Sequence, residues 1–569
     1  MPDEAARLTE LGERYFRTQH SYDPYNATLL GLTEFDALAG DPSRAASEAA
    51  AADFAAIDAE LAALDTAQLD AAGQVDHAVL TVLSRGAGRD AHHSLWAANA
   101  SAKGYVSRQG LVFQAVPAMT IADPDGARRY EERLAGIGPF LAALGERYAQ
   151  EAADGRTPTA LGVQHALGQL TGHLGRDLDD DALLAPTASA DPAVRERARE
   201  TLRSAVRPAM AALAERLRTE LLPVARPDDR VGISAIPGGA EGYADAVARH
   251  TTTELTPAEI HQIGLDTLAE LRPRWLEIGR RALGVGDFPA IAERLRSDLS
   301  LRFETSAQIV DVAEQALQRA QAAQDAWFPR HDIPPCVIEE IDPLDAEGAA
   351  LAYYRPPAVD GSRPGAHCLQ TTHPTERFRF EYEALAFHES VPGHHLQLAT
   401  AQTLDLPRYR QHLDVEACSF NEGWGLYAEQ LAEEMGLYSG DVALLGMLSF
   451  ASLRACRLVV DTGVHAFGWS RSRAIEFMYE HTATTREHVT SEVDRYICWP
   501  GQALAYVVGK REIVRLRERA RAELGDRFDL RAFHGVVLGS GALPLPVLDQ
   551  TVARWTAGAR TPEEASTWT

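Results

Sequence analysis

The stretch FHESVPGHHLQ, Phe387–Gln397, decides how the rest of the chain is interpreted. It begins like a His-Glu-x-x-His helix, in which two histidines four residues apart hold one metal ion and the glutamate activates a water molecule. The fourth position after His388 is Pro392, however, so the usual second histidine is missing from its place. A metal site here therefore requires a local departure from helical geometry.

The residues that follow His388 supply such a departure. Pro392 has no N–H, and its ring collides with the carbonyl of His388, so the helix should kink or bulge there. Gly393 tolerates the dihedral angles that a bulge needs. If two residues bulge out, His394 takes the place of the missing ligand. His395 is the less favoured alternative and is expected to contact substrate or a carboxylate behind the site.

A third ligand is expected from a neighbouring helix. The segment FNEGWGLYAE, Phe420–Glu429, lies far enough beyond His394 for a turn at Leu406-Pro407 and an antiparallel return. Glu422 would complete a His-His-Glu set and leave a fourth position open, as a catalytic zinc site requires. Glu429, two turns further along the same face, would orient a ligand histidine. Two imidazoles and a carboxylate favour zinc, although manganese or cobalt can occupy the same ligands.

The rest of the chain predicts a mainly α fold. Apolar residues recur at three- and four-residue spacing, and Thr256-Pro257-Ala258-Glu259 has the N-cap, proline and glutamate of a helix start. One region is instead rich in proline, glycine and tyrosine, and its expected strands are Cys336–Ile341, Leu351–Tyr354 and His367–Thr371. The predicted organisation is a helical N-terminal lobe over 1–330 and a small sheet with a helical catalytic region over 331–569, as one intertwined unit.

Charge and cysteine content exclude several classes of function. The 569 residues include 81 acidic and 55 basic ones, which argues against nucleic acid and an anionic membrane surface as partners. The five cysteines are odd in number and never spaced Cys-x-x-Cys, so neither a disulfide framework nor a thiolate zinc site is expected. The N-terminus has no apolar signal segment, and the longest uncharged helical stretch, Val442–Leu453, is too short for a bilayer. These features predict a cytoplasmic protein and indicate no oligomeric state.

Several motifs together resemble those of the bacterial domain-of-unknown-function 885 family. They are His-Glu-x-x-Pro-Gly-His-His-x-Gln at 388–397, Asn-Glu-Gly-Trp-x-Leu-Tyr-x-Glu at 421–429, Tyr-Arg-Pro-Pro at 354–357 with Asp-Gly-Ser-Arg-Pro-Gly at 360–365, Arg-Leu-Val-Val-Asp-Thr-Gly-x-His at 457–465, and Trp-Pro-Gly-Gln-Ala-Leu-Ala-Tyr at 499–506. The resemblance covers most of the chain, to about Arg515.

More distantly, the layout is similar to that of the helical gluzincin peptidases: angiotensin-converting enzyme, thimet oligopeptidase, the carboxypeptidase Taq group and dipeptidyl peptidase III. These keep a Gly-His pair at the end of the metal motif, which favours His394 over His395 as the ligand. The resemblance implies a two-lobed helical fold with a deep cleft. It also implies a short edge strand before the metal helix that pairs with the substrate backbone.

The function predicted from these features is zinc-dependent hydrolysis of amide bonds in short peptides or acyl amino acids, as in a dipeptidase or carboxypeptidase. His388, His394 and Glu422 would hold the ion, which polarises the scissile carbonyl and lowers the pKa of a water to about 7. Glu389 would take the proton from that water and pass it to the leaving amine.

Other polar residues are candidates for stabilising the oxyanion and for binding substrate. The expected electrophile is Tyr506, with His465 second and Tyr496 third. The candidates for anchoring a substrate carboxylate are polar residues spaced four apart and an arginine: Gln502, Tyr506, Lys510 and Arg363.

Two other functions are compatible with the sequence. The same ligands would serve hydrolysis of a non-peptide amide or a lyase reaction, because these chemistries share the metal triad. The chain could also be a non-catalytic helical binding protein with a residual site. The intact Glu389 argues against that function, since a decayed site can lose its base without unfolding.

Overall fold

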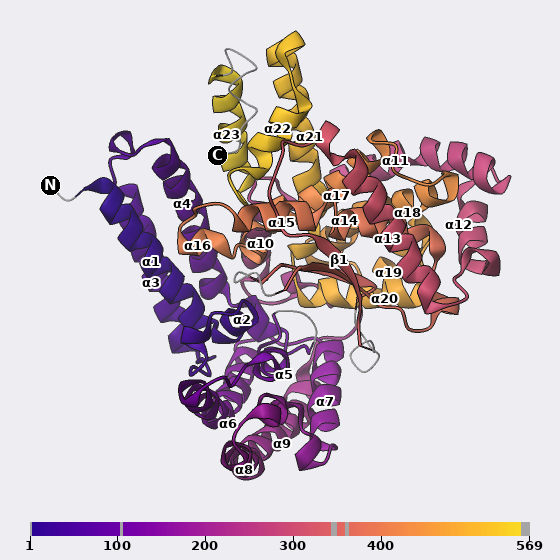
Figure 1. Ribbon diagram of the computed structural model, residues 1–569. Helices are drawn as coiled ribbons and strands as arrows, with labels where there is room; N and C mark the ends of the chain where they lie inside the picture. Colours follow the sequence, from indigo (N-terminus) through magenta and orange to yellow (C-terminus); the bar gives the residue numbers. More distant parts are fainter. Residues whose placement is uncertain (1–2, 103–105, 343–349, 359–362, 559–569) are drawn as a thin grey trace. The chain divides into compact units, whose positions relative to one another are not determined.

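The computed structural model describes residues 3–102, 106–342, 350–358 and 363–558 (Figure 1). Helices dominate these residues and their strands form one small sheet, so the predicted mainly α class is confirmed. The chain divides into two compact units. Unit 1 comprises Met1–Ala246, Gly463–Arg473 and Glu492–Pro500, and unit 2 comprises Val247–Thr462, Ala474–Ser491 and Gly501–Thr569.

This division differs from the predicted boundary at residue 330. Helices α11 (Pro257–Leu283), α12 (Phe288–Ser297) and α13 (Ser306–Ala323) belong to unit 2, because α11 and α13 pack on later helices. Gly264 of α11 lies so close to α18 (Asp441–His465) that a Cβ there would be 2.7 Å from Val459 Cγ2. Such contacts join residues far apart in the sequence. Local hydrophobic periodicity therefore cannot show on which side of a unit boundary a helix lies.

Unit 1 is built of helices that each bury an apolar face. In α6 (Pro124–Ala153) the residues Tyr130, Leu134, Ile137 and Leu141 recur every three or four positions and are fully buried. The other helices that begin in unit 1 before residue 246 are α1 (Glu4–Tyr22), α2 (Pro24–Leu29), α3 (Arg44–Ala62), α4 (Ala71–His93), α5 (Arg108–Ala118), α7 (Ala160–Leu174), α8 (Pro192–Thr201), α9 (Arg207–Arg216) and α10 (Gly239–Thr251).

Unit 2 opens with the predicted helix start at Thr256. The Thr256 hydroxyl accepts a hydrogen bond from the Glu259 N–H (3.3 Å), and the Glu259 carboxylate accepts one from the Thr256 N–H (2.8 Å), as a capping box requires. The later helices of unit 2 are α14 (Tyr382–Glu389), α15 (His394–Gln402), α16 (Arg408–Gln411), α17 (Cys418–Glu434), α21 (Ala505–Leu524), α22 (Leu530–Leu538) and α23 (Leu545–Gly558). Four helices have residues in both units: α10, α18, α19 (Arg471–His481) and α20 (Arg486–Cys498).

The small sheet lies in unit 2 and has the strand order β1-β3-β2. Strands β1 (Cys336–Glu340), β2 (Ala352–Arg355) and β3 (Gly365–Leu369) match the three predicted strands within two residues. β3 pairs in parallel with β1 and antiparallel with β2. The strand before the metal helix is therefore central, and the expectation of an edge strand there is wrong because both of its sides already bond other strands. The edges belong to β1 and β2.

Helix α18 extends well beyond the uncharged stretch Val442–Leu453. Its 25 residues and a mean hydropathy of 1.6 satisfy the length and composition of a bilayer-crossing helix. However, 83% of that apolar window is buried inside the protein. Gly446 illustrates the close packing, since a Cβ there would collide with the carbonyl oxygen of Phe380. The burial is that of a core helix.

Helices α17 and α21 cross at two glycines. A Cβ on Gly423 would lie 2.6 Å from the Cα of Gly509, and a Cβ on Gly509 would collide with the carbonyl oxygen of Ser419. Only glycine allows backbones to approach this closely. The crossing brings the start of α21, with Tyr506, against the ligand-bearing part of α17.

Candidate metal centre

The segment with the three histidines is broken into two helices. α14 ends at Glu389 and α15 begins at His394, with Ser390 and Gly393 in non-helical conformations between them. A Cβ on Gly393 would collide with the carbonyl oxygens of Phe387 and His388. The glycine is therefore required by close contact with the preceding turn, and the predicted kink at Pro392 takes the form of a complete break.

The break brings two imidazoles onto one carboxylate. The rings of His388 and His394 are perpendicular (89°), with centroids 4.8 Å apart. Glu422 Oε2 lies 3.4 Å from His388 Nε2 and 3.6 Å from His394 Nε2. One ligand atom from each of these three residues lies within 4.8 Å of the other two. The structure thus assembles the three residues that the sequence selected as ligands.

Helix α17 lies against both halves of the broken segment (Figure 1). The Trp424 indole N–H donates to the carbonyl of Pro392 (2.9 Å) and so fixes the connection between α14 and α15. Gly425 makes room for His388, since a Cβ there would be 2.6 Å from its Cε1 atom. Glu429 Oε1 lies 2.8 Å from His388 Nδ1, the contact expected of a carboxylate that orients a metal-binding histidine.

The charges of the cluster are strongly coupled. Burial works to lower the pKa of His388, but hydrogen bonds with Glu422 and Glu429 outweigh it and raise that pKa to about 9. Burial works to raise the pKa of Glu422, but bonds with His388 and His394 hold it well below its ordinary value. A divalent cation entering the cluster would displace the proton of His388, as metal binding to imidazole requires.

Glu389, the expected base, is the last residue of α14 and directly follows the ligand His388. Its side chain is 9% exposed. Among the described residues, no hydrogen bond holds its carboxylate, although its charge acts on His388. A carboxylate that neighbouring groups leave uncommitted is suited to accept a proton from water.

Tyr506 lies beside the ligands but is bound to one of them. Its hydroxyl donates to Glu422 Oε1 (2.9 Å), and the Arg457 guanidinium lies 4.4 Å from the centre of its ring. In this arrangement Tyr506 orients the ligand carboxylate. The predicted role as an electrophile would require this hydrogen bond to be exchanged for one to the reacting oxyanion.

The two other candidate electrophiles belong to unit 1, and their polar atoms are engaged there. The Ile233 N–H donates to His465 Nδ1 (3.1 Å), so Nε2 carries the proton and donates to the carbonyl of Tyr496 (3.0 Å). Burial lowers the pKa of His465 to about 4. The Tyr496 hydroxyl donates to Glu492 (2.5 Å). These bonds are those of packing residues, and the catalytic roles predicted for His465 and Tyr496 lose their support.

His395 connects α15 to the sheet. Its Nδ1 lies 3.0 Å from the Tyr354 hydroxyl of β2, and its ring also hydrogen-bonds the backbone of Pro334. Burial lowers the pKa of His395 to about 4. Of the two neighbouring histidines, His394 therefore faces Glu422 and His395 has a structural position, where a contact with substrate or a carboxylate had been expected.

Two of the substrate-binding candidates, Gln502 and Tyr506, hydrogen-bond residues of helix α17. Gln502 lies in a 3-10 turn before α21, and its amide donates to the Cys418 thiol (3.4 Å). Burial lowers the pKa of Lys510 and outweighs the negative charge of Glu429, which works to raise that pKa. Arg363 Nη1 is buried and has no hydrogen-bond partner among the described residues. Residues 360–362 of the predicted turn lie outside the described residues.

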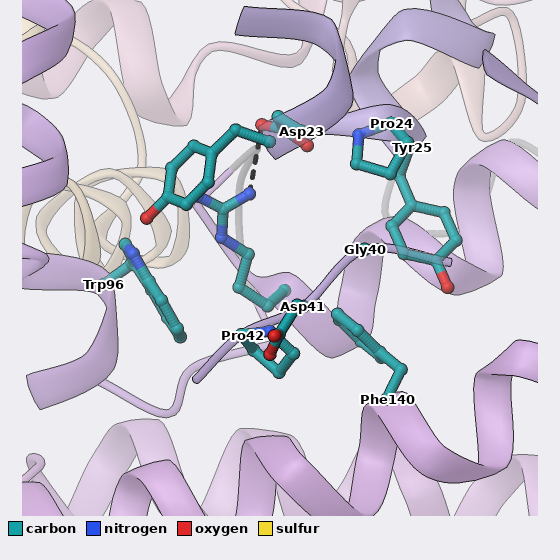
Figure 2. A pocket seen from close by; sticks show the side chains of 10 residues that line it. Asp23, Pro24, Tyr25, Gly40, Asp41, Pro42, Trp96 and Phe140 are labelled. Atoms are coloured by element: carbon teal, nitrogen blue, oxygen red, sulfur yellow. Dashed lines mark ion pairs between the residues drawn. The ribbon is translucent and has the colours of Figure 1, made fainter. Parts of the chain in front are cut away.

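A small pocket lies wholly in unit 1 (Figure 2). Arg108 reaches into it, forms an ion pair with Asp23 (3.2 Å) and lies over the ring of Trp96. Tyr25 and Phe140 form the opposite wall (Figure 2). The cavity of about 10 Å³ has room for roughly one water molecule. It has neither the volume nor the donor set of a substrate site.

Three residues that support the cluster through hydrogen bonds were not indicated by the sequence: Gln397, Asn421 and Trp424. Gln397 follows His394 by three residues, which places both on one helix face. Asn421 immediately precedes the ligand Glu422. Helical spacing would have indicated Gln397, whereas the contacts of Asn421 and Trp424 depend on the path of the chain between α15 and α17.

The fold and the site define a large, mainly helical protein in which two histidines and a glutamate lie close enough together to hold a metal ion. The family described as "Bacterial protein of unknown function (DUF885)" matches residues 24–552. The chain therefore belongs to this family, as its motifs predicted. No curated protein matches the chain.

Two solved structures are similar to the whole chain. One is the crystal structure of the "putative lipoprotein" from Colwellia psychrerythraea, with 26% identity, a TM-score of 0.87 and coverage of 98% of this chain and 100% of that chain. The other is a "putative lipoprotein of unknown function" from Shewanella oneidensis, with 18% identity, a TM-score of 0.76 and coverage of 96% and 99%. The second likeness concerns the fold alone.

Proposed function

We propose that this protein is a metal-dependent hydrolase that cleaves amide bonds in short peptides or acyl amino acids. The observation that carries the proposal is the convergence of His388, His394 and Glu422, whose ligand atoms lie within 4.8 Å of one another. Glu389 is adjacent in the chain to the first of these ligands. Metal ligands beside an uncommitted carboxylate form the arrangement used for metal-assisted hydrolysis.

The donor set fits a divalent transition-metal ion. Two imidazole nitrogens and one carboxylate oxygen suit zinc, with manganese and cobalt as alternatives. His388 has a carboxylate partner on its other nitrogen, as metal-binding histidines usually have. When bound, such an ion would supply a Lewis acid for a carbonyl group and lower the pKa of a water molecule.

The chain's own residues supply proton transfer and ligand positioning. Glu389 accepts the proton of the attacking water and delivers it to the leaving nitrogen as the amide bond breaks. Tyr506 holds Glu422 through its second oxygen, so the carboxylate keeps Oε2 directed at the two imidazoles. Arg363, whose buried Nη1 has no hydrogen-bond partner among the residues that the structure describes, is a candidate for an anchor to a substrate carboxylate.

The experiment is a hydrolysis screen of dipeptides, N-acyl amino acids and simple amides by mass spectrometry, with and without a chelator. The wild-type protein should hydrolyse a subset of them, and the chelator should abolish the activity. Glu389→Gln should keep the metal and lose about 10²–10⁴-fold in rate. The exposed Glu314→Gln on α13 is the matched control and should behave like wild type.

Each outcome of this screen separates the candidate functions. Turnover of non-peptide amides alone would replace the peptidase proposal with an amidohydrolase. Metal binding without turnover of any substrate would favour the binding-protein function. Activity that survives Glu389→Gln would contradict the proposed mechanism.

The cellular location stays a prediction. The sequence predicts the cytoplasm, whereas both similar structures are described as lipoproteins, which would place this chain at a membrane surface if it shared that property. Fractionation of cells that produce the full-length native gene product decides between the two, because a lipid-anchored protein sediments with membranes.

A further inference from the structure

The second ligand, His394, has an amide behind it rather than a carboxylate. Its Nδ1 lies 3.4 Å from Gln397 Oε1, and both residues lie on the first turn of α15. Gln397 is 2% exposed, so water does not compete for its amide. The direction of this one hydrogen bond decides which nitrogen of His394 carries the proton.

The orientation of Gln397 is fixed by its neighbour on α17. Its Nε2 lies 2.5 Å from Asn421 Oδ1, and Asn421 is itself buried. Asn421 Nδ2 lies 3.0 Å from the carbonyl oxygen of Leu413 and 3.2 Å from that of Asp414. The three side chains therefore form a continuous series of hydrogen bonds that starts at the backbone.

The direction of this series follows from chemistry. Backbone carbonyl oxygens only accept, so the NH₂ group of Asn421 must face Leu413 and Asp414. Its oxygen then faces Gln397, which must donate through its own NH₂ group. The remaining oxygen of Gln397 can only accept, so Nδ1 of His394 must donate. Amide orientations are usually open to interchange of O and N, but here two carbonyls settle them.

We propose that Asn421 and Gln397 are positioning residues that fix the tautomer in which His394 can bind metal. With a proton held on Nδ1, Nε2 is the nitrogen left to bind an ion, in place of its contact with Glu422 Oε2, 3.6 Å away. If the hydrogen bonds ran in the opposite direction, the proton would lie on Nε2, and this nitrogen could not bind a metal ion. This inference rests on the metal site of the proposed function but not on the reaction or the substrate.

The test uses variants of the full-length protein and two measurements. Asn421→Leu and Gln397→Met remove the polar groups at nearly constant volume, and the double variant combines them. Gln402→Met is the matched control, because Gln402 lies on the same helix and donates to the carbonyl of Pro357. Zinc affinity is measured by competition with a chelator. Histidine ¹⁵N NMR of metal-free protein reports the tautomer of His394, whose signals are assigned by their loss in His394→Gln.

Each single variant should bind zinc about 10–100-fold more weakly than wild type, as loss of an outer hydrogen-bond partner usually does. The double variant should be no weaker than the weaker single variant, because both belong to one series. The NMR spectrum should change from one tautomer to a mixture. In the Asn421→Leu background, which removes the accepting Oδ1 that a carboxylate would otherwise face, Gln397→Glu should restore zinc binding, since a carboxylate also accepts from Nδ1, and it guards against a packing defect of the methionine.

The inference is overturned by unchanged affinity and tautomer in Asn421→Leu, by double-variant losses that multiply, or by failure of Gln397→Glu to restore binding in the Asn421→Leu background. A different result would contradict the proposed function. If wild-type protein binds no zinc, the metal site is wrong, while the NMR comparison still decides whether the series fixes the tautomer.

Discussion

His388 and His394 face the same carboxylate but are held in different ways. His388 lies in the last turn of α14 and has the buried carboxylate of Glu429 on its Nδ1. His394 begins α15 and has the neutral amide of Gln397 in the equivalent place. Two carboxylates raise the pKa of His388 to about 9, and the C-terminal end of a helix also favours positive charge there. One imidazole is thus held by charge and the other by the direction of hydrogen bonds.

The difference shows how the cluster can be stable without an ion and still accept one. The charge of Glu422 is balanced by a protonated His388, which a divalent cation can replace. An amide behind the second imidazole adds no further negative charge to a buried site. The cluster therefore avoids the cost of a further buried carboxylate.

Gly393→Ala should have the largest effect, because it removes the break on which the comparison depends. A Cβ there meets the carbonyl oxygens of Phe387 and His388, so the backbone must move and His394 leaves the cluster. We expect a loss of about 1–3 kcal/mol in the free energy of unfolding and loss of measurable zinc binding. Thermal unfolding and chelator competition check this. Gly440→Ala, where no atom lies within 4 Å, should change neither quantity.

Glu429→Gln would make the two imidazoles alike. The amide oxygen can still accept from His388 Nδ1, but the charge is lost, and we expect zinc affinity to fall about 10–100-fold. The proton on His388 should also become less tightly bound. Chelator competition at several pH values measures both effects. Full zinc affinity in Glu429→Gln would show that the charge behind His388 does not contribute to zinc binding. It would contradict the proposed difference between the two histidines.

Tyr506→Phe tests the carboxylate that both imidazoles share. It removes one hydrogen bond to Glu422, which is worth about 1 kcal/mol, so zinc affinity should fall roughly fivefold. Tyr496→Phe, in unit 1, should leave zinc affinity unchanged. A loss of about 10²–10³ in turnover by Tyr506→Phe, with only a small change in affinity, would instead identify Tyr506 as the oxyanion electrophile.

The smallest effect concerns buried histidines that lack carboxylate partners. Burial lowers the pKa of His465 to about 4, below the value near 6.5 of the unfolded chain. Below pH 6.5 the unfolded state binds more protons than the folded state, so stability falls as the pH drops from 6.5 towards 4. Between pH 8 and pH 6 we expect His465 to account for about 0.5–1 kcal/mol. Denaturant unfolding should show this pH dependence reduced in His465→Gln; an unchanged dependence would contradict it.

Much of the fold was predictable because it depends on local patterns. Helical periodicity, the cap at Thr256 and the three strands are properties of short segments, and the structure reproduces them. The boundary between units and the central place of β3 were not predictable in this way. Both depend on contacts between segments separated by many residues in the sequence.

The candidate site likewise combines features that depend on local sequence with features that depend on distant contacts. The chemistry of proline and glycine was enough to expect a break at Pro392-Gly393 and to prefer His394 over His395. The nitrogens of His465 are engaged by the backbone of the distant Ile233 and Tyr496, and the Tyr496 hydroxyl is engaged by the Glu492 carboxylate. A sequence motif gives their identity but cannot show that their polar atoms are already engaged.

The most direct test of the central claim is the number of zinc ions bound per chain, measured in wild type and in two neighbouring variants. The account predicts one ion per chain in wild type, loss of the ion in His394→Gln, and retention in His395→Gln, whose imidazole contacts Tyr354 instead. Absence of zinc from the wild-type protein, or retention of zinc by His394→Gln, would contradict it.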